Sequence, residues 1–223
     1  MEVMDLLKTN IWKYNRNFIY NSEFQKNINR YKYIFFDLDH TLFNEYVFLY
    51  KKNLSFLSKY NLSNKRKNDI VLFMMKQIIY EKIKELIQKI NKYFCEDFSI
   101  SLFLRNLRSK DDIKINLFKG VKIVLNKLIQ NDYKVFLYTS GNLRQQKNKV
   151  ELLKLNQFFL QNVIYAHGNF KKPNPILLKN FLVNRSLEQS KVLFIGDSKE
   201  DLQLCKNIRI KFKNINTIFP KIV

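Results

Sequence analysis

The sequence predicts an α/β protein with a doubly wound parallel sheet and a second, small, all-helical domain. From residue 116 onward, short apolar segments alternate with amphipathic ones. This alternation is typical of a parallel sheet covered by helices on both faces. Between residues 45 and 115, apolar positions recur every three to four residues and no strand-like run interrupts them. That period predicts helices alone.

Five segments are expected to form strands, each apolar throughout, as strands covered on both faces should be. They are 33–37, 134–139, 162–166, 191–196 and a last one near 214–218. The helices expected between them are 121–130, about 143–155, 175–183 and 199–207. The clearest helical piece of the middle segment is 69–94, and we assign its Phe73, Met74, Met75 and Tyr80 to helix packing.

Composition excludes several classes of protein. Of the 223 residues 46% are hydrophobic, which excludes a wholly disordered chain. The sequence has no run of about 18 apolar residues, so we expect no segment that spans a bilayer. The first thirty residues have no apolar h-region followed by a small-residue cleavage site, so we expect no secretory signal. Cys95 and Cys205 are too few for a disulfide framework or a thiolate metal site, so we expect two reduced, mostly buried thiols. A cytoplasmic protein is expected.

The formal net charge of +21 is the most unusual property of the composition. Charge of this size can indicate a nucleic-acid partner. The basic residues, however, are scattered along the chain, with one short cluster at 65–67, and the richness in Lys, Asn, Ile and Phe follows AT-rich codons. We therefore favour a solvated basic surface, with nucleic-acid binding as the alternative.

Polar groups gather just after the predicted strands. The segments concerned are Asp37-Leu38-Asp39-His40-Thr41, Thr139-Ser140-Gly141-Asn142, Lys171-Lys172-Pro173 and Gly196-Asp197-Ser198, with Asp201 one helical turn further on. Because the carboxyl ends of parallel strands meet at one edge of a sheet, these groups should converge. Carboxylates, hydroxyls and a lysine around a hard divalent cation are what phosphoryl transfer requires.

These same segments resemble the four signature regions of the haloacid dehalogenase-like (HAD) superfamily, in the right order. The regions are YIFFDLDHTLF, VFLYTSG, KKPNP and FIGDSKEDL, and the resemblance covers nearly the whole chain after about residue 30. The segment after Thr139 and the helical insertion are similar to the subgroup of phosphoglycolate phosphatases and pyrimidine 5′-nucleotidases. The resemblance implies a HAD-like Rossmannoid catalytic core at 31–44 and 116–223 and a helical cap at 45–115. Residues 1–30 would be an N-terminal extension without a motif.

The resemblance also implies a role for each matching residue. Asp37 would be the nucleophile that forms an aspartyl-phosphate, and Asp39 the general acid and base. Thr139, Ser140 and Lys172 would hold the phosphate. Mg²⁺ would be bound by Asp37, Asp197 and the backbone carbonyl of Asp39. Asp201 would bind the metal or order its water.

Two positions, His40 and Ser140, depart from the pattern of the superfamily. A third, Asp39, matches the pattern and bears on the type of reaction. His40 stands where Gly or Asn is common, and we interpret it as a loop variant. Ser140 replaces a frequent Asn. Asp39 supplies the acid that the dehalogenases of the superfamily lack, so phosphate esters are the expected substrates.

The sequence therefore predicts a Mg²⁺-dependent phosphatase that acts on a small phosphorylated metabolite. The alternatives are a polynucleotide 3′-phosphatase or nucleic-acid-associated protein, motivated by the charge, and a phosphotransferase or mutase that shares the aspartyl-phosphate step.

Overall fold

The computed structural model describes residues 15–77, 83–110 and 113–220. The chain forms two compact units, which we describe separately. The helical unit contains the described residues between Glu45 and Ile115, and the sheet unit contains those of 15–44 and 116–220.

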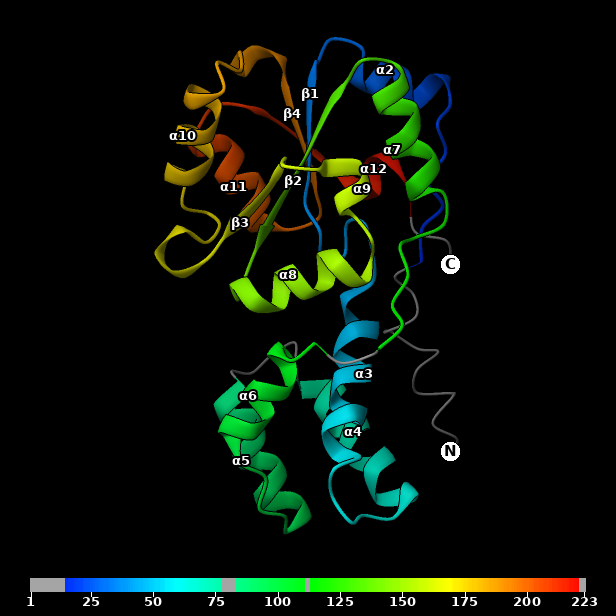
Figure 1. Ribbon diagram of the computed structural model, residues 1–223, viewed down its shortest axis with the longest axis vertical. Helices are drawn as coiled ribbons and strands as arrows, with labels where there is room; N and C mark the ends of the chain where they lie inside the picture. The colour runs from blue at the N-terminus through cyan, green and yellow to red at the C-terminus, as the bar shows by residue number, and fades with distance from the viewer. Residues whose placement is uncertain (1–14, 78–82, 111–112, 221–223) are drawn as a thin grey trace. The chain divides into compact units, whose positions relative to one another are not determined.

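The sheet unit is built on five parallel strands in the order β3-β2-β1-β4-β5 (Figure 1). The strands are β1 (Tyr33–Phe36), β2 (Lys134–Ser140), β3 (Val163–Ala166), β4 (Val192–Gly196) and β5 (Lys211–Asn214). All four residues of β1 and all five of β4 are buried, because both of their faces are covered. The prediction of a doubly wound α/β fold is confirmed.

Helices connect the strands and cover the sheet. They are α2 (Ser22–Ile28), α7 (Val121–Gln130), α8 (Leu143–Leu152), α9 (Asn156–Phe159), α10 (Ile176–Asn184), α11 (Lys199–Asn207) and α12 (Ile215–Ile218). Figure 1 shows α10 and α11 on one side of the sheet and α7 on the other. On the first side, Phe35 stacks on Phe136 with ring centroids 4.5 Å apart, and Leu178, Leu182 and Leu204 close the same core cluster.

The prediction of the last strand of this unit was wrong. The strand expected near 214–218 lies earlier, at β5, and Asn214 caps the short helix α12 that follows it. β5 is a half-exposed edge strand with two lysines, and lysine is a common protection of sheet edges. The apolar residues after β5 do not form a strand. Ile215, which begins α12, and Phe219, which follows it, are the buried ones.

The helical unit consists of α3 (Glu45–Leu57), α4 (Asn64–Gln77), α5 (Ile83–Phe94) and α6 (Ile100–Arg108). Their apolar faces share one core, to which Met74 and Met75 contribute buried side chains, as expected of packing residues. Phe73 packs against this core from a partly buried position, and Tyr80 lies outside the described residues. Cys95 is exposed here, contrary to the prediction of two buried thiols, and Cys205 of the sheet unit is buried.

Within the described part of the chain, no helix is long and apolar enough to cross a membrane. Of the N-terminal extension, residues 1–14 lie outside that part, and residues 22–28 form α2. Asn21 caps α2 by accepting a hydrogen bond from Phe24 N at 2.8 Å.

Candidate active site

The polar groups predicted to converge lie at one edge of the sheet unit. Asp37 directly follows β1 and donates its backbone N–H to Ile195 O of β4 at 2.9 Å. Thr139 and Ser140 end β2, and Asp197 directly follows β4. Lys172 comes from the loop between β3 and α10, and its backbone N–H donates to Ser140 Oγ at 3.1 Å. The carboxyl ends of the strands thus bring these residues together.

A buried lysine holds two of the carboxylates. Lys172 Nζ forms ion pairs with Asp37 Oδ1 and, at 2.6 Å, with Asp201 Oδ1. Its side chain is only 5% exposed. Burial lowers the pKa of Lys172, but Asp37 and Asp201 outweigh this effect and the pKa is raised, so the side chain stays an ammonium.

The three carboxylates of Asp37, Asp197 and Asp201 form a cluster that could hold a metal ion. One oxygen of each lies within 4.8 Å of the others. Burial raises the pKa of Asp197 to about 6, and the carboxylate of Asp201 adds to that effect. Three carboxylates thus face one ammonium, and their oxygens are the hard donors that Mg²⁺ prefers. The residues present therefore fit a divalent cation.

Asp201 has a second, structural role. Its Oδ2 accepts hydrogen bonds from Ser198 N at 3.2 Å and Ser198 Oγ at 2.8 Å, and Ser198 Oγ accepts from Asp201 N. This reciprocal pattern is a capping box at the start of α11. A β-carbon on Gly196 would lie 2.4 Å from Asp201 Oδ2, so only glycine leaves room for the box.

The carboxylate of Asp39 is held by two residues that the sequence analysis did not identify. Lys149 Nζ of α8 lies 2.7 Å from Asp39 Oδ1, and Gln146 Nε2 donates to Asp39 Oδ2 at 3.0 Å. Gln146 Oε1 in turn accepts from Thr139 Oγ1 at 3.1 Å. Lys149 is fully buried, with Nζ 5.8 Å from the centroid of the Phe43 ring. We call Gln146 and Lys149 the Asp39 clamp.

A buried arginine from the N-terminal extension supports the loop after β1. Arg16 is 0% exposed and donates to His40 O and to Asn216 Oδ1, both at 2.7 Å. Its guanidinium also lies 5.6 Å from the Phe118 ring centroid. His40 itself has a φ of 55°, a left-handed conformation that favours Gly or Asn. The hydrogen bond from Arg16 helps to hold this conformation at a histidine.

Comparison with models of protein families shows to which family the chain belongs. The model of the haloacid dehalogenase-like hydrolases matches residues 34–215. The chain belongs to this family. The match includes all the residues of the site except Arg16 and Asn216, which lie outside it.

Solved structures of this hydrolase family share the fold at low sequence identity. A provisionally assigned β-phosphoglucomutase from Thermotoga maritima is 16% identical, covers 81% of this chain and 83% of its own, and has a TM-score of 0.61. A predicted phosphoglycolate phosphatase from Haemophilus somnus 129pt is 20% identical over 84% of this chain and 88% of its own, with a TM-score of 0.58.

A curated relative matches a shorter region. The glyceraldehyde 3-phosphate phosphatase of Pyrococcus abyssi is 29% identical over 93 residues, which are 41% of this chain. The matched region spans 39% of the length of that relative.

Replacing Arg16 by Met should destabilise the protein by about 2–4 kcal/mol, because the His40 carbonyl and the Asn216 amide oxygen lose a charged donor that is itself fully buried. For a chain of this size the melting temperature should fall by about 5–15 °C. Thermal unfolding followed by circular dichroism measures this. The exposed Arg30→Met is the control and should change stability by less than about 0.5 kcal/mol. Equal effects of the two substitutions would contradict the role given to Arg16.

Replacing Gly196 by Ala should cost about 1–3 kcal/mol, because the new methyl group overlaps the Asp201 carboxylate. Chemical denaturation of the single and double variants tests the cause. In an Asp201→Ala background the overlap is largely removed, so the same change should cost less than about 1 kcal/mol. Costs that simply add would show that the carboxylate is not the obstacle.

Proposed function

We propose that this hydrolase is a Mg²⁺-dependent phosphatase that acts on a small phosphate monoester through an aspartyl-phosphate on Asp37. One observation carries the proposal. The ammonium of Lys172 bonds Asp37 and Asp201 within a cluster of three carboxylates, at the edge of the sheet where ligands of this architecture bind. Such a set of charges suits the stabilisation of a phosphoryl group during transfer.

The proposed first step is an in-line attack on phosphorus. An oxygen of Asp37 forms the new bond to phosphorus while the bond to the ester oxygen breaks, and Asp39 donates a proton to the departing alcohol. Lys172 neutralises the phosphoryl oxygens, while the Ser140 hydroxyl and the backbone at Thr139 and Ser140 hold them. Mg²⁺ bound by Asp37, Asp197 and the Asp39 carbonyl, with Asp201 beside it, would supply further neutralisation of the phosphoryl oxygens.

The second step releases phosphate and restores Asp37. A water molecule attacks the aspartyl-phosphate, and Asp39, now ionised, accepts its proton as the bond between phosphorus and Asp37 breaks. We assign the hydroxyl of Thr139 a supporting function as well, since it donates to Gln146 and is fully buried.

We further propose that the helical unit is the cap of the enzyme and that the substrate is a phosphorylated small metabolite. The names of the relatives support this substrate class: a glyceraldehyde 3-phosphate phosphatase, a predicted phosphoglycolate phosphatase, and CbbY from Rhodobacter sphaeroides crystallised with xylulose-(1,5)-bisphosphate. All three names contain a small phosphorylated carbon compound. The net charge of +21 supports a second candidate, a polynucleotide 3′-phosphatase.

Replacing Asp37 by Asn should lower phosphate release by at least about 10³-fold, because the amide cannot act as the nucleophile. Release would be measured on sugar phosphates, phosphoglycolate, nucleoside monophosphates and 3′-phosphorylated oligonucleotides. EDTA should abolish it and added Mg²⁺ should restore it. The exposed Asp132→Asn is the matched control.

The preferred ester in this panel separates the two candidates. Faster turnover of the oligonucleotides than of every small ester would favour the polynucleotide 3′-phosphatase. Turnover that persists in Asp37→Asn would exclude the proposed nucleophile.

The Asp39 clamp should act by positioning. Replacing Lys149 by Met removes the ammonium from Asp39, and the misplaced carboxylate should lower kcat by about 10–100-fold with little change in KM. Lys147→Met, on the exposed face of the same helix, is the control and should leave kcat within about two-fold. Lys149→Arg should recover part of the loss. Equal kcat values in the Lys147 and Lys149 variants would remove the clamp from the mechanism.

A further inference from the structure

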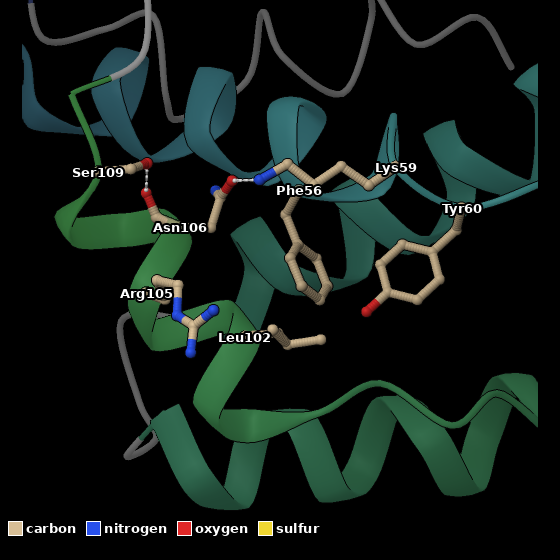
Figure 2. Close-up of a pocket in the computed structure, with 7 residues that line it drawn as sticks. All are labelled: Phe56, Lys59, Tyr60, Leu102, Arg105, Asn106 and Ser109. Atoms are coloured by element: carbon tan, nitrogen blue, oxygen red, sulfur yellow. Dashed lines mark hydrogen bonds between the residues drawn. The ribbon is translucent and has the colours of Figure 1, made fainter.

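The helical unit contains a cavity that the proposed reaction does not use. Its volume is about 390 Å³, within the range of small-molecule sites. Figure 2 shows the lining residues, which come from the end of α3, the loop after it, α6 and the residue that follows α6. They are Phe56, Lys59, Tyr60, Leu102, Arg105, Asn106 and Ser109.

The walls of the cavity are mainly apolar and aromatic. Phe56 is 1% exposed and fixed edge to face against Phe103, with ring centroids 5.1 Å apart. Tyr60 packs 5.1 Å from the Phe56 ring. Leu102 is 46% exposed although it lies beside these rings. A flat apolar group placed between Tyr60 and Leu102 would remove that apolar surface from water.

The charged groups of the lining are all positive. Lys59 and Arg105 contribute two cations, and no Asp or Glu lines the cavity. Lys59 Nζ donates to Asn106 Oδ1 at 3.0 Å, and Asn106 is 2% exposed and anchored by its donation to Lys52 O at 2.8 Å. The position of the Lys59 ammonium is therefore set by a buried amide.

Arg105 is the cation that has no such anchor. It makes no hydrogen bond and no ion pair with any residue in the described part of the chain. A guanidinium presents a planar fork of donors that matches the two oxygens of a carboxylate, sulfonate or phosphate. Tyr60 adds a neutral phenol, since burial and then the charge of Asp97 raise its pKa.

We propose that this cavity is a binding site for a small organic anion with an aromatic body. The ring lies between Tyr60 and Leu102, and the acid group bonds Arg105 and Lys59. The aromatic and apolar lining distinguishes the site from the scattered basic surface, which would attract any anion equally. The proposal concerns binding alone and does not depend on the phosphatase activity.

Calorimetric titration of the full-length protein with naphthalene-1-sulfonate tests the proposal. One molecule should bind per chain, with methanesulfonate as the anion that lacks the aromatic body. Arg105→Gln removes the acid-binding group, and Leu102→Glu places a carboxylate in the cavity. Each should weaken binding by at least about five-fold. Both positions are exposed, so the fold should tolerate the changes, which thermal unfolding verifies.

The matched control is Lys84→Gln, which removes one charge from an exposed position on α5. It should weaken binding by less than about two-fold, and methanesulfonate should not compete. Equal weakening by Lys84→Gln and Arg105→Gln would overturn the proposal, because attraction to the general surface charge would then explain the binding. Competition by methanesulfonate, binding unaffected by Leu102→Glu, or no saturable binding would overturn it as well.

Discussion

The candidate active site depends above all on the two ion pairs that Lys172 forms with Asp37 and Asp201. A buried ammonium between Asp37 and Asp201 offsets part of the repulsion among three carboxylates. Removing one partner of a buried ion pair typically costs about 3–5 kcal/mol, because a charge is left without compensation. The same lysine receives its backbone anchor from Ser140, and Asp201 receives its orientation from the capping box of α11. One lysine thus connects the end of β1 and the end of β2 with the first turn of α11.

The carboxylate of Asp39, the second aspartate of the first motif, is held in place by residues other than Lys172. Asp39 lies two residues from Asp37, yet its partners are Lys149 and Gln146 of α8 rather than Lys172. Two neighbouring aspartates therefore have different surroundings, which is how a site can give a nucleophile and a proton donor separate tasks. The division follows from the elements that face each carboxylate: Asp37 meets Lys172 of the loop between β3 and α10, and Asp39 meets α8.

The sequence predicted the sheet and the convergence of Asp37, Thr139, Lys172 and Asp197, because apolar strands followed by polar turns are a strong local signal. It did not identify Lys149, since one more lysine in a chain with 40 basic residues looks like surface. A signal was present nonetheless: Lys149 lies on the same side of α8 as buried Gln146 and Leu153, three or four residues away. Arg16 gave no comparable signal, because it precedes any periodic segment and its partners are distant in sequence.

The pair of Arg16 and Asn216 has a consequence for biosynthesis. These residues are 200 positions apart, yet the same guanidinium holds the turn that contains His40, three residues after the proposed nucleophile. Contacts of such long range form late, after the intervening elements have docked. A nascent chain on the ribosome therefore cannot form this contact before residue 216 has emerged. The proposed nucleophile would therefore reach its final setting only after residue 216 has been synthesised.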